Sequence, residues 1–197
     1  YEFYRCDWSS DVCSSDLSHA VQGLVVTGAG LAMIGFYFVR SRTKGWAPTL
    51  SYLGSVGIVG AFALAGALQK GPLASIIYKT SVSLRGQYWK AGIEMGSHHP
   101  LTGVGMDSYG NYYRLYRSEY AATVLPGPRT ITNAAHNVVI DIFAYGGYPL
   151  LLSYLAILGI SIWAIIRVTL RNRAYDGIFV ALATTWLAYQ LQSIISI

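Results

Sequence analysis

Charged residues and cysteines are scarce in this chain of 197 residues. Asp, Glu, Lys and Arg together make up 12% of the sequence, whereas about a quarter is normal for soluble proteins. The two cysteines, Cys6 and Cys13, lie close together near the N-terminus, so they indicate neither a disulfide framework nor a metal site. There is no Asp-x-Asp pair and no glycine-rich turn after a strand, which argues against nucleotide-sugar and dinucleotide folds.

Hydrophobic residues are abundant instead. They make up 53% of the chain, and the mean hydropathy is +0.40. The net charge of +5 comes from short Lys and Arg clusters that flank apolar segments, which is not the pattern of a nucleic-acid-binding surface. Composition therefore predicts a membrane protein without a nucleic-acid partner.

Residues 1–17, YEFYRCDWSSDVCSSDL, show no helical or strand periodicity. They resemble a translated sequencing adapter, and we expect them to be non-native. Residues 191–197 end within an apolar run that has no cap. We therefore expect residues 18–197 to be the C-terminal part of a longer membrane protein.

Four apolar segments predict an all-α, polytopic membrane fold. Residues 21–39 and 49–68 each approach the ~20 residues that a helix needs to cross a hydrocarbon core of ~30 Å. A third segment covers residues 138–166, where the Gly-Gly-Tyr-Pro cluster at 146–149 should kink the helix. A fourth segment begins near Gly177. In the alternative, the first two segments are buried helices of a soluble protein, but such long apolar runs with basic flanks are unusual there.

Short basic connections predict the orientation of these segments. The connections between the first two and the last two segments contain Arg40, Arg42 and Lys44, and Arg167, Arg171 and Arg173, respectively. Because short loops rich in Lys and Arg stay in the cytoplasm, residues 70–137 should form a long, partly helical loop on the outer side.

The outer loop is rich in basic residues and poor in acids. Its basic residues are Lys79, Arg85, Lys90, Arg114, Arg117 and Arg129, and its acids are Glu94, Asp107 and Glu119. No two of the acids have the spacing of a metal-binding pair. Because Arg and Lys side chains can neutralise phosphates by themselves, the loop predicts an anionic ligand that is bound without a metal or another cofactor.

A helix is predicted over residues 85–97, with Trp89 and two glycines on the same face as Arg85. Arg85 is either a residue that binds a pyrophosphate or an arginine whose stem follows the membrane interface. The segment HPLTGVG at 99–105 is more typical of a tight turn than of a phosphate cradle.

A second helix is predicted over residues 108–120, with Asp107 as its cap. Its tyrosines recur at i, i+4, i+7 and i+11 and form one stripe, made of Tyr109, Tyr113, Tyr116 and Tyr120. Arg114 and Arg117 lie on the neighbouring face. Such a helix either lies on the membrane with its tyrosines at head-group level or forms a platform for sugar rings beside a phosphate-binding pair.

His136 is the candidate general base. Thr132 or Asn133 can cap the third apolar helix, which would place His136 in its first turn. The positive end of a helix keeps the ring neutral and also attracts phosphate; a purely structural histidine is the alternative. Asp141 lies deeper in the apolar stretch, where an ionisable group is costly. Its offset of five residues disfavours a direct pair with His136, so its role is open.

These residues together resemble the C-terminal signature of the O-antigen ligase-like family. The signature consists of Arg85 and Trp89, the HPLTGVG segment, and His136-Asn137 followed after nine residues by Gly147. The resemblance covers residues 18–197, and its parts follow the family's order between membrane segments. The family includes O-antigen ligases, O-antigen polymerases and bacterial protein O-oligosaccharyltransferases. Leu150 departs from the small or hydroxyl residue that ligases often have at that position, which leaves the subfamily open.

The resemblance implies a metal-independent glycosyltransferase in the bacterial cytoplasmic (inner) membrane. It would take a glycan from a polyprenyl-pyrophosphate carrier and transfer it, on the outer side, to a hydroxyl of an acceptor glycolipid, glycan or protein. Arg85 would hold the pyrophosphate, and His136 would activate the hydroxyl. Six further residues are expected to bind substrate, namely Arg114, Arg117, Arg129, His99, Asn137 and Tyr113. The family has another essential arginine in an earlier outer loop, so we expect residues 18–197 alone to be inactive.

Three other functions are to be distinguished from this one. A polysaccharide polymerase of the same family would differ in its acceptor, which no residue identifies. A transporter for anionic solutes would have polar or broken helices near the membrane midplane, whereas Asp141 is the one charged residue in the predicted spans and lies near the interface. A non-catalytic membrane scaffold would have no need of His136 together with Arg85.

Overall fold

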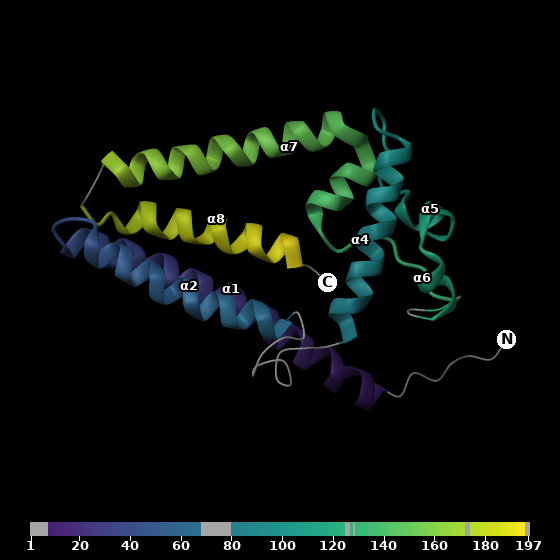
Figure 1. Ribbon diagram of the computed structural model, residues 1–197, viewed down its shortest axis with the longest axis horizontal. Coiled ribbons are helices and arrows are strands. Elements are labelled where there is room, and N and C mark those ends of the chain that lie inside the picture. The colour runs from purple at the N-terminus through teal and green to yellow at the C-terminus, as the bar shows by residue number, and fades with distance from the viewer. Residues whose placement is uncertain (1–7, 68–79, 125–126, 128, 172–173, 196–197) are drawn as a thin grey trace. The chain divides into compact units, whose positions relative to one another are not determined.

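The computed structural model describes residues 8–67, 80–124, 127, 129–171 and 174–195, and every regular element within these ranges is a helix (Figure 1). In chain order the helices are α1 (Trp8–Arg42), α2 (Ala47–Ala67), α4 (Thr80–His98), α5 (Tyr109–Tyr116), α6 (Glu119–Thr123), α7 (Val138–Arg171) and α8 (Gly177–Ile195). The predicted all-α class is therefore confirmed for the described ranges. Residues 1–7 of the adapter-like stretch, Lys79 with the start of the outer loop, Arg173, and residues 196–197 lie outside the described residues.

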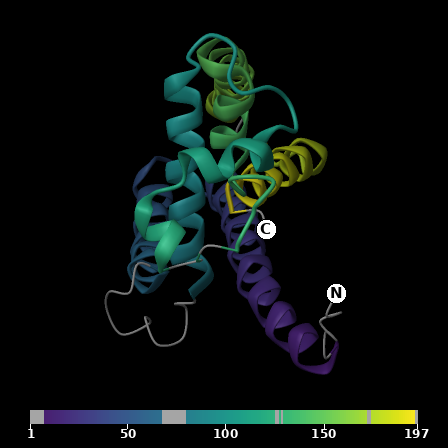
Figure 2. The same cartoon turned by 90° about the vertical axis from the view of Figure 1, so that its right-hand side faces the viewer.

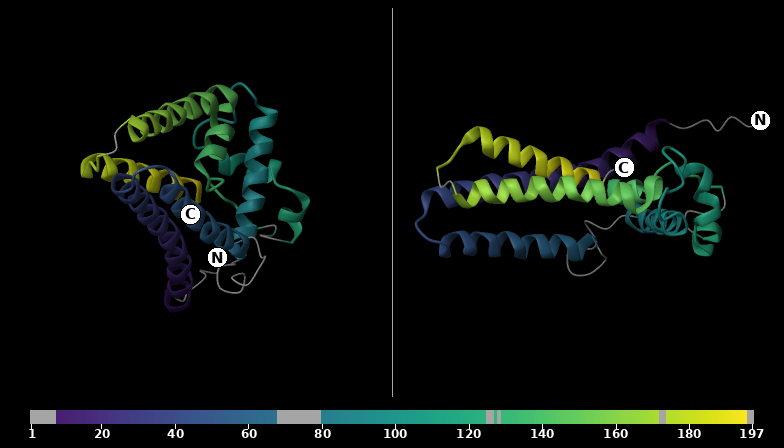
Figure 3. Two further views of the ribbon diagram at one scale, coloured as in Figure 1. Left: turned by 60° about the vertical axis from the view of Figure 1, so that its left-hand side comes forward. Right: turned by 90° about the horizontal axis from the view of Figure 1, so that it is seen from above.

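Contacts within the chain define two compact units, which are residues 1–79 with 176–188 and residues 80–175 with 189–197. In the first unit, α1 and α2 follow one another across a short turn and pack side by side (Figure 3). Tyr52 of α2 donates its hydroxyl to the carbonyl of Ala32 in α1, 2.9 Å away. Phe179 of α8 packs edge-on against Tyr37 of α1, with ring centroids 5.6 Å apart. The first unit is therefore a small cluster of apolar helices.

Three of the described helices are long and apolar enough to cross a membrane, and their spans are Gly23–Arg42 in α1, Ala47–Gly66 in α2 and Val138–Arg171 in α7. They match the first three predicted segments. The fourth predicted segment is also a helix, α8, but it is not among these three, so the count of four spans stays a prediction. Large apolar side chains remain exposed on the spans, such as Val59 at 70% and Ile160 at 65%. A soluble protein would bury a face of this kind, so the soluble alternative is disfavoured.

The second unit is built on α4, which packs against α7 and α5 (Figures 1 and 2). Its core is formed by six residues with no exposed surface, namely Ala91, Met95, Tyr109, Tyr113, Ala135 and Ala144. Two glycines let α4 approach α7 closely. A Cβ on Gly92 would lie 2.6 Å from Ile140, and one on Gly96 would lie 2.5 Å from the ring of Phe143. The helix predicted over 85–97 is therefore confirmed, and its glycine face is the one that contacts α7.

α7 is kinked at Gly147, whose backbone angles are φ 62° and ψ −158°, and Pro149 follows two residues later. The kink predicted from the Gly-Gly-Tyr-Pro cluster is confirmed. In a continuous helix the carbonyls of Ala144 and Tyr145 would accept from residues 148 and 149. The kink removes the first of these donors, and proline has no N–H to supply the second. Both carbonyls therefore need other partners.

The turn at 100–105 supplies these partners. Its Val104 and Gly105 donate their N–H groups to the two open carbonyls of α7, at 2.8 and 3.1 Å. In the opposite direction, Pro100 accepts a hydrogen bond from the N–H of Tyr148 at 2.7 Å. The HPLTGVG segment is thus the tight turn that its glycines indicated, and its backbone groups bind α7 rather than cradling a phosphate. We use the name clasp for this turn together with the kink of α7 to which it is bound.

Gly103→Ala should destabilise the protein more than Gly105→Ala. Both glycines have a positive φ, 61° and 97°, so alanine costs about 1–2 kcal/mol at either position. A Cβ on Gly103 would also collide with the backbone of Tyr145 and Gly146, whereas a Cβ on Gly105 meets Ser108 Oγ at 3.4 Å. We expect that collision to cost about 1–3 kcal/mol more. Thermal unfolding of the full-length protein in detergent measures the difference, and equal losses would show that the clasp is not closely packed.

The helix predicted over 108–120 is in fact two shorter helices. α5 ends because Arg117 has extended backbone angles, and Ser118 then caps α6 by accepting a hydrogen bond from the N–H of Ala121. Ser118 is suited to the N-cap position of α6, because the side-chain oxygen of a serine at a helix start can accept from a free N–H group. The residue before α5 is Ser108 rather than the predicted cap, Asp107.

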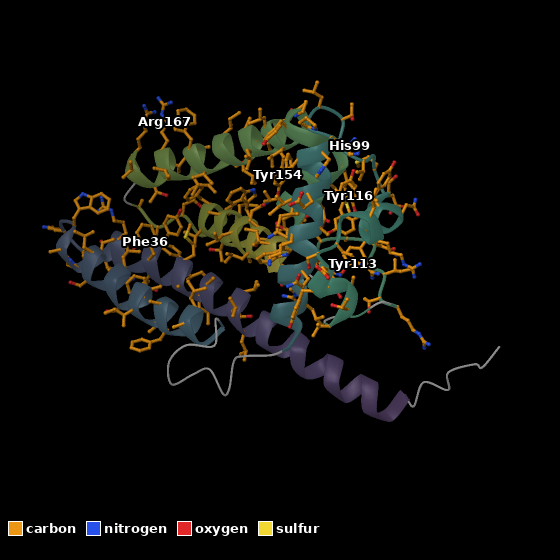
Figure 4. The ribbon with its side chains drawn as sticks, turned by 45° about the vertical axis from the view of Figure 1, so that its right-hand side comes forward. Phe36, His99, Tyr113, Tyr116, Tyr154 and Arg167 are labelled. Carbon is orange, nitrogen blue, oxygen red and sulfur yellow. The ribbon has the colours of Figure 1, made fainter. Side chains whose placement is uncertain are left out.

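The tyrosine stripe does not lie on a surface along its whole length. Tyr109 and Tyr113 are completely buried against α4, and Tyr120 is 51% exposed. Figure 4 shows Tyr113 and Tyr116 together on the side of α5 that faces α4. The expectation that the whole stripe meets head groups or sugar rings is therefore corrected, because half of it forms the core of the second unit.

Candidate active site

Asn137, rather than the predicted Thr132 or Asn133, is the N-cap of α7. Its side-chain oxygen accepts hydrogen bonds from two N–H groups of the first turn, at 3.0 and 3.3 Å, as asparagine commonly does at this position. His136 consequently precedes the helix instead of lying in its first turn, and its backbone is left-handed with φ 60°. This placement corrects the prediction.

The half-buried ring of His136 lies beside Tyr88 of α4, with centroids 5.8 Å apart. Nε2 of the ring is 3.4 Å from the hydroxyl oxygen of Thr132, and that hydroxyl donates its one proton to the carbonyl of Ala134 at 2.8 Å. The oxygen of Thr132 can then only accept from the ring, and the tautomer that makes this contact has its proton on Nε2 and its lone pair on Nδ1. Nδ1 is therefore the atom that can take a proton.

Arg85 is the second charged or titratable residue of the site, and it belongs to α4. It lies three residues before Tyr88, which puts both side chains on one face of the helix, and its charge acts on the imidazole of His136. No carboxylate lies within ion-pair distance of the partly buried guanidinium in the described part of the chain, where the one contact between an acidic and a basic side chain joins Glu94 and His98. Among the described residues, Arg85 is thus a cation without an ion-pair partner, and its charge acts on a histidine.

The surroundings of His136 keep its imidazole neutral. Burial lowers the pKa of His136 from its ordinary value of 6.5, the carboxylate of Asp141 raises it, and the cation of Arg85 lowers it again, with a lowered pKa as the result. A neutral ring at pH 7 agrees with the prediction, although burial and not the helix end is the main cause. Burial also lowers the pKa of Arg85, but a guanidinium remains protonated in proteins. The site therefore combines a free base with a cation.

The three other arginines of the predicted site are placed differently. Arg114 of α5 and Arg129 are exposed. Arg117 is half-buried, and its Nη1 donates to the carbonyls of Gly127 and Thr130 at 3.4 and 3.5 Å. Arg117 therefore helps to hold the segment that follows α6, and the substrate-binding roles of all three arginines stay predictions.

The remaining predicted substrate contacts also have structural partners. His99 follows the end of α4, roughly 20 Å along the helix from Arg85 at 1.5 Å per residue, and its Nε2 is 3.1 Å from the hydroxyl of Tyr116 (Figure 4). Asn137 caps α7. Tyr113 is buried, and its hydroxyl has no hydrogen-bond partner among the described residues. Their roles in substrate binding stay predictions that no contact of the structure tests.

Two features of the site were not predicted from the sequence, namely the place of Tyr88 and the contact of Asp141. Tyr88 fills the space beside His136, and its spacing of three from Arg85 would have placed it on the same helix face. Asp141 was noticed, but its contact was not foreseen. One of its carboxylate oxygens accepts a hydrogen bond of 2.6 Å from the N–H of Ala135, on the far side of His136 along the chain.

A separate groove of about 760 Å³ lies on the opposite face of α4. Its lining residues are Lys90, Ile93, Glu94, His98, Leu115, Tyr116 and Ser118. It includes none of the residues predicted to form the site. Over the described ranges, no group of three or more His, Cys, Asp or Glu side chains is arranged to hold a metal ion.

A family model described as O-antigen ligase matches residues 17–155. The matched range contains α4, α5, α6 and the kinked first part of α7, and so it includes the whole site around Arg85 and His136. No curated protein and no solved structure matches the chain. Because the family match covers more than half of the 197 residues, the chain belongs to the O-antigen ligase family.

Proposed function

We propose that the full-length protein is a glycosyltransferase that moves a glycan from a polyprenyl-pyrophosphate carrier to an acceptor hydroxyl outside the bacterial inner membrane. Family membership indicates an O-antigen ligase-like or polymerase-like function in that membrane. One observation carries the finer proposal. The neutral imidazole of His136 lies within the field of the Arg85 cation, which has no acid partner among the described residues.

The proposed reaction assigns one role to each group. Nδ1 of His136 takes the proton of the acceptor hydroxyl as its oxygen attacks the anomeric carbon of the glycan. The bond from that carbon to the pyrophosphate oxygen breaks, and the electron pair leaves with polyprenyl pyrophosphate. Arg85 stabilises the negative charge that develops on the departing oxygen. A guanidinium thereby takes the part that a metal ion takes in other phosphate-releasing enzymes, and the proposal includes no metal.

The geometry of α7 supports a site on the outer side. Its 23 residues from Pro149 to Arg171 give roughly 34 Å of helix at 1.5 Å per residue, enough for a hydrocarbon core of ~30 Å. His136 precedes one end of α7, and Arg167 lies near the other end (Figure 4). If the basic end stays in the cytoplasm, His136 faces outward, and the exposed apolar faces of the spans are available to a polyprenyl tail.

A reconstituted assay tests the proposed function. Purified full-length protein is mixed with a lipid-linked oligosaccharide and with candidate glycolipid, glycan and protein acceptors. Release of polyprenyl pyrophosphate together with a glycosylated acceptor supports a transferase, and the acceptor used distinguishes a ligase from a polymerase. Movement of solute across proteoliposomes without bond cleavage would instead identify a transporter.

Transfer should persist as the pH falls below 6.5. The base form of His136 is lost only when the pH falls through its folded-state pKa, which burial places below 6.5. At pH 6.5 the wild type should therefore keep more than half of its plateau kcat/KM, whereas an enzyme whose histidine had the ordinary pKa would keep half. The acid limb is the part of the pH profile in which kcat/KM falls as the pH decreases. Initial rates measured between about pH 5 and pH 9 locate its midpoint. A midpoint above 6.5 would contradict the assignment of a buried, neutral base.

A further inference from the structure

We infer that Asp141 is a positioning residue, which holds His136 in its left-handed conformation by binding the backbone on the other side of it. The inference rests on the proposed function, since it concerns the orientation of the general base. It assigns to a residue of α7 a role that requires no contact with the acceptor or the pyrophosphate.

The backbone of His136 needs such a restraint. Its φ of 60° lies in a region that non-glycine residues seldom occupy, and such conformations persist only when their surroundings enforce them. On the C-terminal side, Asn137 begins the helix as its cap, and its carbonyl accepts from the N–H of Asp141 at 2.9 Å. On the N-terminal side, the carboxylate of Asp141 accepts from the N–H of Ala135 at 2.6 Å. The residues before and after His136 are therefore both tied to Asp141.

An ordinary helix-start acid does not account for this contact. An acid in the first turn usually stabilises the helix dipole or accepts from the free N–H groups of its own helix. The carboxylate of Asp141 instead leaves α7 and binds Ala135, two residues before the cap. Ala135 itself is completely buried, so its N–H would otherwise be an unsatisfied donor in the core. The hydrogen bond thus closes a short loop of the chain that contains the backbone of His136.

The charge of Asp141 also acts on the base. The groups that interact with the pair are Arg85 and Tyr88 of α4, Tyr109 of α5, and Tyr145 of α7. Of these, Arg85 is the cation. Its charge lowers the pKa of the imidazole of His136, whereas the charge of Asp141 raises it. Removing the negative charge while keeping the hydrogen bond should therefore lower the pKa of His136 further.

Two substitutions separate the hydrogen bond from the charge. Asp141→Asn keeps an oxygen that can accept from Ala135, so the ring should stay in place while its charge environment changes. We expect the acid limb of kcat/KM to move to lower pH, with kcat at pH 7 within about threefold of the wild type, because a weaker base costs little when its geometry is kept. Asp141→Ala removes both, and kcat should fall by about 10²-fold while KM for the lipid-linked donor stays within about twofold, since binding contacts are unchanged.

The ring pKa of His136, measured by NMR of histidine-labelled full-length protein, gives a readout that does not depend on activity. It should fall in Asp141→Asn and stay unchanged in the control Asp176→Asn, which alters an aspartate that accepts from two N–H groups at the start of α8. An unchanged His136 pKa in Asp141→Asn, or a wild-type kcat in Asp141→Ala, would overturn the inference. If the wild type transfers no glycan, the proposed function fails, and the NMR titration still decides whether Asp141 acts on His136.

Discussion

His136→Ala should lower the rate of glycan transfer by about 10²–10⁴-fold, the usual contribution of a positioned general base. The acceptor hydroxyl would then lack the proposed base, Nδ1 of His136. The amount of protein in the membrane should not change, because the imidazole is half-buried and lies outside the three spans. Initial rates with a purified lipid-linked oligosaccharide measure the effect.

Two further variants distinguish the loss of the base from a loss of structure. Alanine is strained at a φ of 60°, whereas asparagine tolerates the left-handed region better, so His136→Asn removes the base while disturbing the backbone less. It should be as inactive as His136→Ala. The matched control is His98→Ala, which removes an exposed histidine of α4 and should transfer at the wild-type rate. Full activity in His136→Asn would rule out the base role.

Arg85→Ala should lower the transfer rate by about 10²–10³-fold, the range found when one donor to a developing negative charge is removed. The loss of the cation should also raise the pKa of His136, because the charge of Arg85 lowers it. The acid limb of the residual activity should therefore move to higher pH. Arg85→Lys should recover only part of the rate, since an ammonium keeps the charge but not the paired N–H donors that match phosphate oxygens.

The control for Arg85 is Lys90→Ala, which removes one positive charge from the opposite, exposed face of the same helix. It should leave both the rate and the acid limb near their wild-type values. If Lys90→Ala had the same effect as Arg85→Ala, the general positive charge of α4 and not a specific guanidinium would be responsible. Unchanged activity in Arg85→Ala would remove Arg85 from the mechanism.

The features that were predicted correctly from the sequence depend on local chemistry. Apolar length predicted α1, α2 and α7 as spans, and the Gly-Gly-Tyr-Pro cluster predicted the kink at Gly147, because proline lacks an N–H and glycine tolerates a positive φ. Helical spacing placed Arg85 on the face of α4 that contacts α7. These predictions needed no information about which distant segments meet.

The features that were missed depend on tertiary partners. The spacing of Tyr109 and Tyr113 predicted an apolar face, but spacing alone cannot tell whether a lipid or another helix covers it, and α4 covers it here. The capping tendencies of Thr132, Asn133 and Asn137 are similar, so the choice between them depends on the contacts made by the helix that follows. For the same reason, the hydrogen bond from Ala135 to Asp141, six residues apart, could not be predicted from their spacing.

The most direct test of the central claim asks whether His136 and Arg85 share one outward-facing donor site. His136→Cys and Arg85→Cys are introduced separately into the full-length protein in a background without other cysteines, and intact membranes are treated with a membrane-impermeant maleimide from either side. We predict labelling of both positions from the outer side only, and slower labelling of both when the lipid-linked oligosaccharide is added. Labelling of either position from the cytoplasmic side, or protection of one position without the other, would contradict a shared site.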